Sequence, residues 1–288
     1  MRNDFSMAQI LDLVTDVGDN IVMKHFLKVD SIAKDDGSPV TIADKEASAA
    51  IISGLNHITP DIPVISEEQS MEKNLEALRN ASRVWVTDPI DGTRSFLDGY
   101  DGFGVHVGLI EKGVPVHGVA YFPAQKRAYF TWDDGKAYMQ DGFDDATPIR
   151  AHHDLKDTLR VAVPWKRSKP PETINGHSYE QVRGVGGEQI CYTASGHVHL
   201  FPYDGRHDDS APEDRLVFAW WDVAAAHAVL RGAGGEMFGL FDGNPIRYND
   251  DSLAVRPLVA GNPNLLKQLG FQINDGGSPE PSGPFVGQ

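Results

Sequence analysis

The 288-residue chain is long enough to bury a sizeable core, and its 41% hydrophobic and 23% charged residues are ordinary for a globular protein. The formal net charge of -15 argues against duplex nucleic acid or an anionic membrane as a partner, since either requires a basic face. The single Cys191 excludes an internal disulfide, and no apolar run resembles a signal-peptide core or a membrane span, so we expect a cytoplasmic protein.

Two amphipathic helices are predicted at the start of the chain. Residues 6–27 carry apolar side chains at helical spacing on one stripe, and residues 47–58 repeat that pattern after a polar turn at 34–40. Thr41 and Asp44 match a capping box at the start of the second helix, which gives Asp44 a structural role.

The chain then alternates short strands with acidic side chains. Residues 62–65 read as a strand that ends in Glu67 and Glu68, and the β-run 84–86 delivers Asp88 to the end of a second strand. Pro89 favours a tight turn, which can gather Asp88, the Ile90 carbonyl and Asp91 around one point. These are hard oxygen ligands suited to Mg2+.

Gly92 and Thr93 follow directly and open a predicted helix, whose backbone N–H groups form a ready anion site. A divalent cation beside an anion site is what phosphate-ester chemistry requires. Asp-Pro-x-Asp-Gly is also an ordinary turn sequence. Taken alone, it does not distinguish a metal site from a turn with no further function.

Strand-like runs and turns after residue 100 indicate an antiparallel meander, followed by an acidic, loop-like boundary at 141–157. Beyond the boundary we expect a strand, a helix and an alternating strand, and then a helix that starts at Trp221-Asp222 and is stopped by Gly234-Gly235. The predicted strands are 103–110, 114–122, 127–132, 159–163, 197–201 and 258–260, and the later helices are 189–195, 221–233 and 263–269.

Two histidine pairs could suggest zinc, namely His197 with His199 and His152 with His153. Neither pair has the cysteine or HExxH partners that zinc sites use, so we interpret both as surface or structural residues. The Pro-, Gly- and Ser-rich tail, 274–288, is predicted to be disordered.

Three separated stretches together resemble the inositol monophosphatase superfamily of metal-dependent, lithium-sensitive phosphatases. They are Ser66-Glu67-Glu68, the run from Asp88 to Thr93, and Trp221-Asp222 running on to Gly234-Gly235. Residues 38–44 and 59–68 particularly resemble the 3'(2'),5'-bisphosphate nucleotidase and histidinol-phosphatase branches. The resemblance implies an α/β (α+β) fold, a layered α-β-α-β-α sandwich. Its N-terminal half, 1–145, would hold the metal and phosphate site, and its C-terminal half, 146–273, would supply Asp222 and a substrate loop.

The resemblance also implies two or three Mg2+ ions and assigns their ligands. Glu67, Asp88 and the Ile90 carbonyl would hold one ion, and Asp88, Asp91 and Asp222 a second. Thr93 and Asp44 would polarise the attacking water, while the Gly92 and Thr93 amides would hold the phosphate. The reaction would be an in-line displacement at phosphorus with no covalent intermediate.

Two departures from the family pattern bear on the substrate. Gly186-Gly187-Glu188-Gln189 stands where the nucleotidase branch has a Ser-Ser-x-Lys-like stretch, so Gln189 replaces its lysine. The charged loop 203–215, which includes Glu213, is longer than usual and carries five acids. If these acids face the site, they disfavour a second phosphate. We therefore expect a singly phosphorylated substrate resembling inositol 1-phosphate or histidinol phosphate, with Gln189 and Glu213 as contacts. The alternative is adenosine 3',5'-bisphosphate.

Two other classes of protein fit the sequence less well. Haloacid-dehalogenase-type phosphatases share Asp-x-Asp-Gly-Thr, but the spacing here is one residue longer, and that family does not account for Glu67 or Asp222. A non-catalytic homologue is disfavoured because every expected ligand is present. The expected partner is a small phosphorylated molecule, and a homodimer is the assembly that the resemblance suggests.

Overall fold

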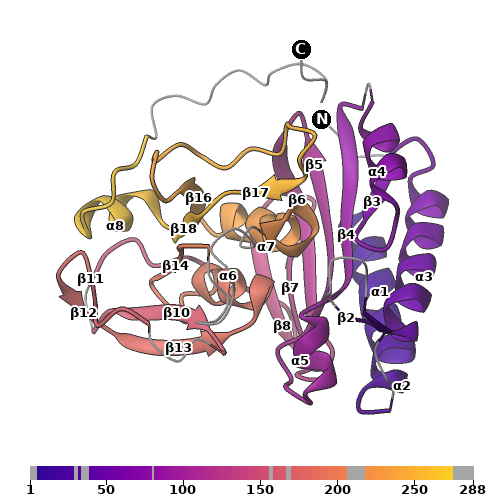
Figure 1. The fold of residues 1–288 in the computed structure, drawn as a ribbon, viewed down its shortest axis with the longest axis horizontal. Coiled ribbons are helices and arrows are strands. Elements are labelled where there is room, and N and C mark those ends of the chain that lie inside the picture. Colours follow the sequence, from indigo (N-terminus) through magenta and orange to yellow (C-terminus); the bar gives the residue numbers. More distant parts are fainter. Residues whose placement is uncertain are drawn as a thin grey trace.

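Helices and sheets alternate in five layers in the computed structural model, which describes residues 5–28, 32–33, 39–79, 81–155, 158–166, 170–205 and 218–274. Figure 1 shows α1 and α3 on one outer face, α6 and α7 between the two large sheets, and α8 on the far side of the second sheet. The predicted α-β-α-β-α sandwich is confirmed. No helix in the described ranges is long and apolar enough to cross a membrane.

The helices are α1 (Met7–Val17), α2 (Met23–His25), α3 (Ile42–Ile58), α4 (Met71–Leu78), α5 (Thr93–Leu97), α6 (Gly186–Ala194), α7 (Trp220–Gly232) and α8 (Pro263–Gln268). A π-helical segment, η1 (Gly18–Val22), joins α1 to α2. The single helix predicted over 6–27 is therefore interrupted. Gly18 is a poor helix former and lies against the Tyr121 ring, where a Cβ would come within 2.6 Å of a ring carbon.

The first large sheet has seven strands in the order β3 (Val64–Ser66), β4 (Arg83–Asp91), β5 (Gly104–Glu111), β6 (Val114–Phe122), β7 (Arg127–Thr131), β8 (Ala137–Asp141) and β9 (Thr147–Pro148). β3 pairs with β4 in parallel, and every later neighbour is antiparallel. The predicted meander is confirmed, and it extends through β9 into the segment that was expected to be a loop.

The second large sheet has the order β13 (Glu180–Gly184), β10 (Arg160–Pro164), β14 (Leu200–Tyr203), β18 (Leu258–Gly261) and β16 (Glu236–Gly239). β10 lies parallel to both of its neighbours, and β18 is antiparallel to β14 and β16. Three two-stranded ladders complete the fold: β1 (Ile32–Ala33) with β2 (Pro39–Val40), β11 (Thr173–Ile174) with β12 (His177–Ser178), and β15 (Phe218–Ala219) with β17 (Ala254–Val255).

One apolar core joins the two large sheets. Val86 and Phe122 of the first sheet share a buried cluster with Ala162 and Phe201 of the second and with Val223 of α7. The division into two halves between residues 145 and 146 stays a prediction, because side chains from both halves belong to the same buried cluster.

The middle layer sits very close to the first sheet. A Cβ on Gly118 of β6 would lie 2.2 Å from the Ala225 carbonyl oxygen, so only glycine allows α7 to approach here. This close packing fixes the start of α7, and with it Asp222, over the first sheet.

The alternating strand predicted at 197–201 begins only at Leu200. The amides of His197 and Val198 both donate to the Tyr192 carbonyl, so these residues end α6 instead of starting β14. The turn at 34–38, most of the 203–215 loop, and the tail after residue 274 lie outside the described residues.

Candidate active site

The two aspartates of the Asp-x-x-Asp stretch lie at the end of β4. Pairing with β5 shifts register between Asp88 and Asp91, so a β-bulge takes the place of the expected tight turn. The Ile90 amide donates to Asp88 Oδ1 at 2.9 Å, and this bond holds the Asp88 carboxylate against its own backbone. Both residues are buried, with at most 6% of their surface exposed.

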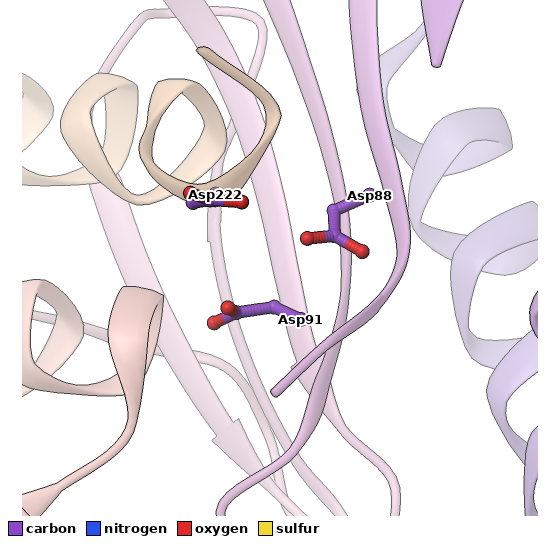
Figure 2. Close-up of side chains that lie close together, drawn as sticks. All are labelled: Asp88, Asp91 and Asp222. Carbon is purple, nitrogen blue, oxygen red and sulfur yellow. The ribbon is translucent and has the colours of Figure 1, made fainter. Parts of the chain in front are cut away.

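Asp222 reaches the same point from the first turn of α7. Its Oδ2 accepts the Ala219 amide at 2.7 Å, as an acidic residue near a helix start does. Oxygen atoms of Asp88, Asp91 and Asp222 all lie within 4.8 Å of one another, although 130 residues separate Asp91 from Asp222. Figure 2 shows the three carboxylates converging between β4 and the N-terminal end of α7. This is the one such group of possible metal ligands in the part of the chain that the structure describes.

Glu67 follows β3, and its charge acts on all three aspartates. The Ile90 carbonyl accepts the Thr93 hydroxyl at 3.2 Å. The structure therefore brings Glu67 and Ile90 to the carboxylate cluster, as the assigned ligand set requires. Their ligand roles stay predictions. Glu68 is partly exposed.

Burial and mutual repulsion dominate the electrostatics of the cluster. Burial, together with the charges of Glu67, Asp91 and Asp222, raises the pKa of Asp88 well above its ordinary value. Burial raises the pKa of Asp91 to about 7, although the Gly187 amide opposes the shift. The pKa of Asp222 is also raised well above its usual range by burial and by Asp91 and Glu67. All donors are hard oxygens that cannot ionise together without a cation, which fits a divalent metal ion.

Asp44 caps its own helix and also contacts Thr93, while its role toward the attacking water stays a prediction. Its Oδ2 accepts the Thr41 amide at 2.7 Å and the Thr41 hydroxyl at 2.6 Å, which confirms the capping box of α3. Its Oδ1 accepts the Thr93 hydroxyl at 3.3 Å. A buried helix cap is thus also the partner of the threonine beside the aspartates.

Gly92 makes the turn from β4 into α5. Its φ of 80° lies in the left-handed region, which glycine adopts without strain. Thr93, 9% exposed, is the first residue of α5, so the amides of Gly92 and Thr93 lie at the start of a helix as predicted. Their phosphate-binding role stays a prediction.

The Gly-Gly pair that departs from the family pattern has a clear structural function. The Gly187 amide donates to Asp91 Oδ2 at 2.8 Å, and a Cβ on Gly186 would lie 2.5 Å from Asp91 Oδ1. The N-terminal end of α6 therefore holds a cluster carboxylate directly. Sequence reasoning missed this contact; a glycine pair that opens a helix was the available signal.

His106 of β5 is a second residue that sequence reasoning missed. It is fully buried, and its Nδ1 lies 3.8 Å from Asp91 Oδ2. Burial lowers the pKa of His106 to about 4, so it is neutral beside the aspartate. A lone histidine in an apolar strand gives no sequence signal that it will lie beside the aspartate cluster.

The predicted substrate contacts are less clearly placed. Gln189 lies in α6 but is only 2% exposed, and Glu213 falls outside the described residues together with most of its loop. The histidine pairs form no group of metal ligands among the described residues. The His152 ring instead stacks on His199 at 4.1 Å, consistent with a structural role.

Comparison with known proteins identifies relatives over nearly the whole chain. The sequence model of the inositol monophosphatase family matches residues 7–273. The chain is 31% identical over 258 residues to the 3'(2'),5'-bisphosphate nucleotidase CysQ of Salmonella typhimurium, covering 87% of this chain and 97% of that protein. It is 35% identical over 234 residues to the chloroplastic bifunctional phosphatase IMPL2 of Arabidopsis thaliana, covering 79% of this chain and 62% of that protein.

The fold of this chain is similar to that of CysQ from Bacteroides thetaiotaomicron, whose crystal structure is described as that of a bacterial member of the inositol monophosphatase family. It aligns with a TM-score of 0.71 at 28% identity and covers 89% of this chain and 96% of that one.

Proposed function

Because the chain belongs to the inositol monophosphatase family, we propose that it is a magnesium-dependent 3'(2'),5'-bisphosphate nucleotidase. Membership makes it a phosphatase, a hydrolase of phosphate esters. The observation that carries the proposed reaction is the buried group formed by Asp88, Asp91 and Asp222.

The support for a nucleoside bisphosphate comes from the relatives. Several curated bisphosphate nucleotidases named CysQ are 27–33% identical to this chain, and most are covered over nine-tenths of their length or more. Residues 38–44 and 59–68 resemble the same branch. The expectation of a singly phosphorylated substrate is therefore the weaker one, because it rested on a loop whose position the described residues do not include.

Asp88, Asp91, Asp222 and Glu67 would hold Mg2+, with the Ile90 carbonyl as a further oxygen donor. When bound, the cations lower the pKa of a water molecule and neutralise the charge of the transferring phosphoryl group. Inhibition by lithium and a homodimeric assembly remain predictions from the family resemblance.

The chain's own residues then activate and orient the nucleophile. The Thr93 hydroxyl can donate to Asp44 Oδ1 or to the Ile90 carbonyl, which leaves its oxygen lone pairs available to a water molecule. Asp44, itself fixed by Thr41, keeps the threonine oriented and can receive the proton that the water loses. The substrate phosphate would lie against the Gly92 and Thr93 amides, where the start of α5 favours negative charge.

A second candidate is hydrolysis of a singly phosphorylated polyol or amino alcohol. Two observations favour it: Gln189 replaces the lysine of the nucleotidase stretch, and the IMPL2 relative at 35% identity is named a phosphatase without reference to nucleotides.

One panel separates the two candidates. Catalytic efficiency would be measured with Mg2+ on adenosine 3',5'-bisphosphate, inositol 1-phosphate, histidinol phosphate and fructose 1,6-bisphosphate. We expect the nucleotide to be preferred by at least about 10-fold, a difference that one charged contact can supply. A preference for inositol 1-phosphate or histidinol phosphate would overturn the nucleotidase proposal in favour of the second candidate. No Mg2+-dependent release of phosphate from any of them would contradict the metal assignment.

A further inference from the structure

A pocket lies at the opposite end of α6 from the aspartate cluster. It encloses about 440 Å³ between β7, β8, the start of β10 and the C-terminal end of α6. A cavity of this size can hold a small organic molecule. Since α6 has nine residues, its two ends lie about 12 Å apart along the helix axis, and the Gly187 amide that binds Asp91 is at the other end.

The walls of the pocket carry two guanidinium groups. Arg160 donates from Nη2 to the Gly196 carbonyl at 3.3 Å, and no acidic side chain among the described residues forms an ion pair with it. Arg127 pairs with Asp141, whose side chain is 41% exposed, so one negative charge offsets that arginine in part. The pocket retains a net positive charge in a protein of net charge -15.

His197 lines the same pocket as both arginines. Partial burial lowers the pKa of its ring, and the positive charges of Arg160 and Arg127 lower it further. A bound anion would offset the positive charges of Arg127 on β7 and Arg160 on β10.

The remaining walls suit a planar ring. Tyr129, Tyr192 and Met139 contribute two aromatic rings and a thioether. The Tyr192 hydroxyl donates to Glu188 Oε1 at 2.6 Å, so this ring is held in place from within α6. Fixed aromatic side chains bury the face of a flat ligand at little entropic cost.

We propose that this pocket, defined by Arg127, Arg160, Tyr129, Tyr192, Met139 and His197, binds a small organic anion that carries a planar ring. Its phosphate or carboxylate lies against Arg160 and Arg127, and its ring packs on Tyr192 and Met139. This site is separate from the aspartate cluster and does not depend on the proposed function.

Adenosine monophosphate is a suitable probe because it combines a phosphate with a flat base. Its binding to metal-free protein would be measured by titration calorimetry, with adenosine and inorganic phosphate in parallel, and the His197 ring would be followed by NMR. Without metal the aspartate cluster repels anions, so turnover and binding at that site do not interfere. We expect saturable binding of the nucleotide that shifts the His197 resonances, and at least about 10-fold weaker binding of adenosine and of phosphate.

Each of the matched variants removes one charge. Arg160→Gln should weaken nucleotide binding about 10- to 100-fold, whereas Arg79→Gln, an exposed arginine at the end of α4, should leave it unchanged. Asp141→Asn frees Arg127 from its carboxylate and should tighten binding several-fold. This variant also keeps the test valid if Arg160→Gln, which loses a bond to Gly196, fails to fold.

Four results would overturn the proposal. They are the absence of nucleotide binding, equal affinity for adenosine, equal affinity in Arg160→Gln, and nucleotide binding that leaves the His197 resonances unchanged. Equal affinity for inorganic phosphate would remove the assigned role of the aromatic walls.

Discussion

Replacing Asp91 with asparagine should stabilise the metal-free protein while it abolishes catalysis. In the folded state without metal, the pKa of Asp91 is raised from an ordinary 3.8 to about 7, chiefly by burial. Above pH 7 the folded protein therefore holds a carboxylate that is easier to ionise in the unfolded chain. At about 1.36 kcal/mol per pKa unit, the difference corresponds to about 4 kcal/mol of destabilisation.

The net gain from Asp91→Asn is smaller than this figure. The neighbouring aspartates share the repulsion, and protons redistribute among them when one charge is removed. The asparagine oxygen can still accept the Gly187 amide, so that hydrogen bond is weakened but not lost. We expect a net stabilisation of about 2 kcal/mol at pH 8, equivalent to a rise of about 3 °C in Tm for a chain of 288 residues.

The pH dependence of stability distinguishes the buried Asp91 charge from other causes of destabilisation. The destabilising effect of Asp91 is full above pH 7, declines as the folded carboxyl gains its proton, and vanishes near pH 4. Thermal unfolding of metal-free wild type and Asp91→Asn, at pH 8 and pH 4.5, should therefore show a gap in Tm that nearly closes at the lower pH.

Exposed Asp61→Asn is the matched control and should change neither Tm nor activity. With Mg2+ present, Asp91→Asn should lose activity by about 10²–10³-fold or more. An Asp91→Asn protein that is less stable than wild type at pH 8, or that keeps full activity, would refute the interpretation of the cluster as a strained metal site.

Four further outcomes can be checked. Thr93→Ala should lower kcat about 10²–10⁴-fold with a smaller change in KM, because the hydroxyl acts on the water and backbone amides hold the phosphate; a pure KM effect in steady-state kinetics would contradict this. Asp44→Ala should resemble it and also cost about 1 kcal/mol in urea unfolding through loss of the α3 cap, whereas unchanged stability would remove the capping role. Mg2+ added to metal-free wild type at pH 8 should raise Tm, and a wild-type rise no larger than that of Asp222→Asn would count against binding at the cluster. Burial opposes ionisation of Glu236, but His227 and Arg231 outweigh burial and lower the pKa of Glu236 to about 2. The ionised carboxylate therefore stabilises the fold fully above about pH 4.5, and this stabilisation is lost towards pH 2. Glu236→Gln should cost about 3 kcal/mol in denaturant unfolding at pH 7 and clearly less at pH 3.

Patterns of neighbouring residues were enough to predict much of the first sheet, and the two aspartates that β4 contributes to the candidate site. Capping residues and apolar spacing located α3, the alternating runs located β5 to β7, and Asp88 and Asp91 lie together because only two residues separate them. Such features depend on contacts within a few residues, and those contacts are written directly in the order of the side chains.

Pairing between distant segments was harder to predict. β13, Glu180–Gly184, is polar and carries no alternating pattern, because it lies at the edge of its sheet and is held by parallel pairing with β10. The strand expected at 197–201 was shortened because Tyr192, at the end of α6, accepts the amides that would have begun it.

By itself the sequence determined the family, since three separated motifs point to one group of phosphatases, and it predicted which residues carry the chemistry. Only the tertiary structure decided how those residues meet. Asp222 reaches Asp91 across 130 intervening residues because Gly118 lets α7 pack closely against the first sheet, and the Gly187 amide then fixes the Asp91 carboxylate. The arginine-lined pocket joins β7, β10 and α6 in the same way. A site built from distant segments depends on the packing of backbone layers, and no local pattern of side chains records that packing.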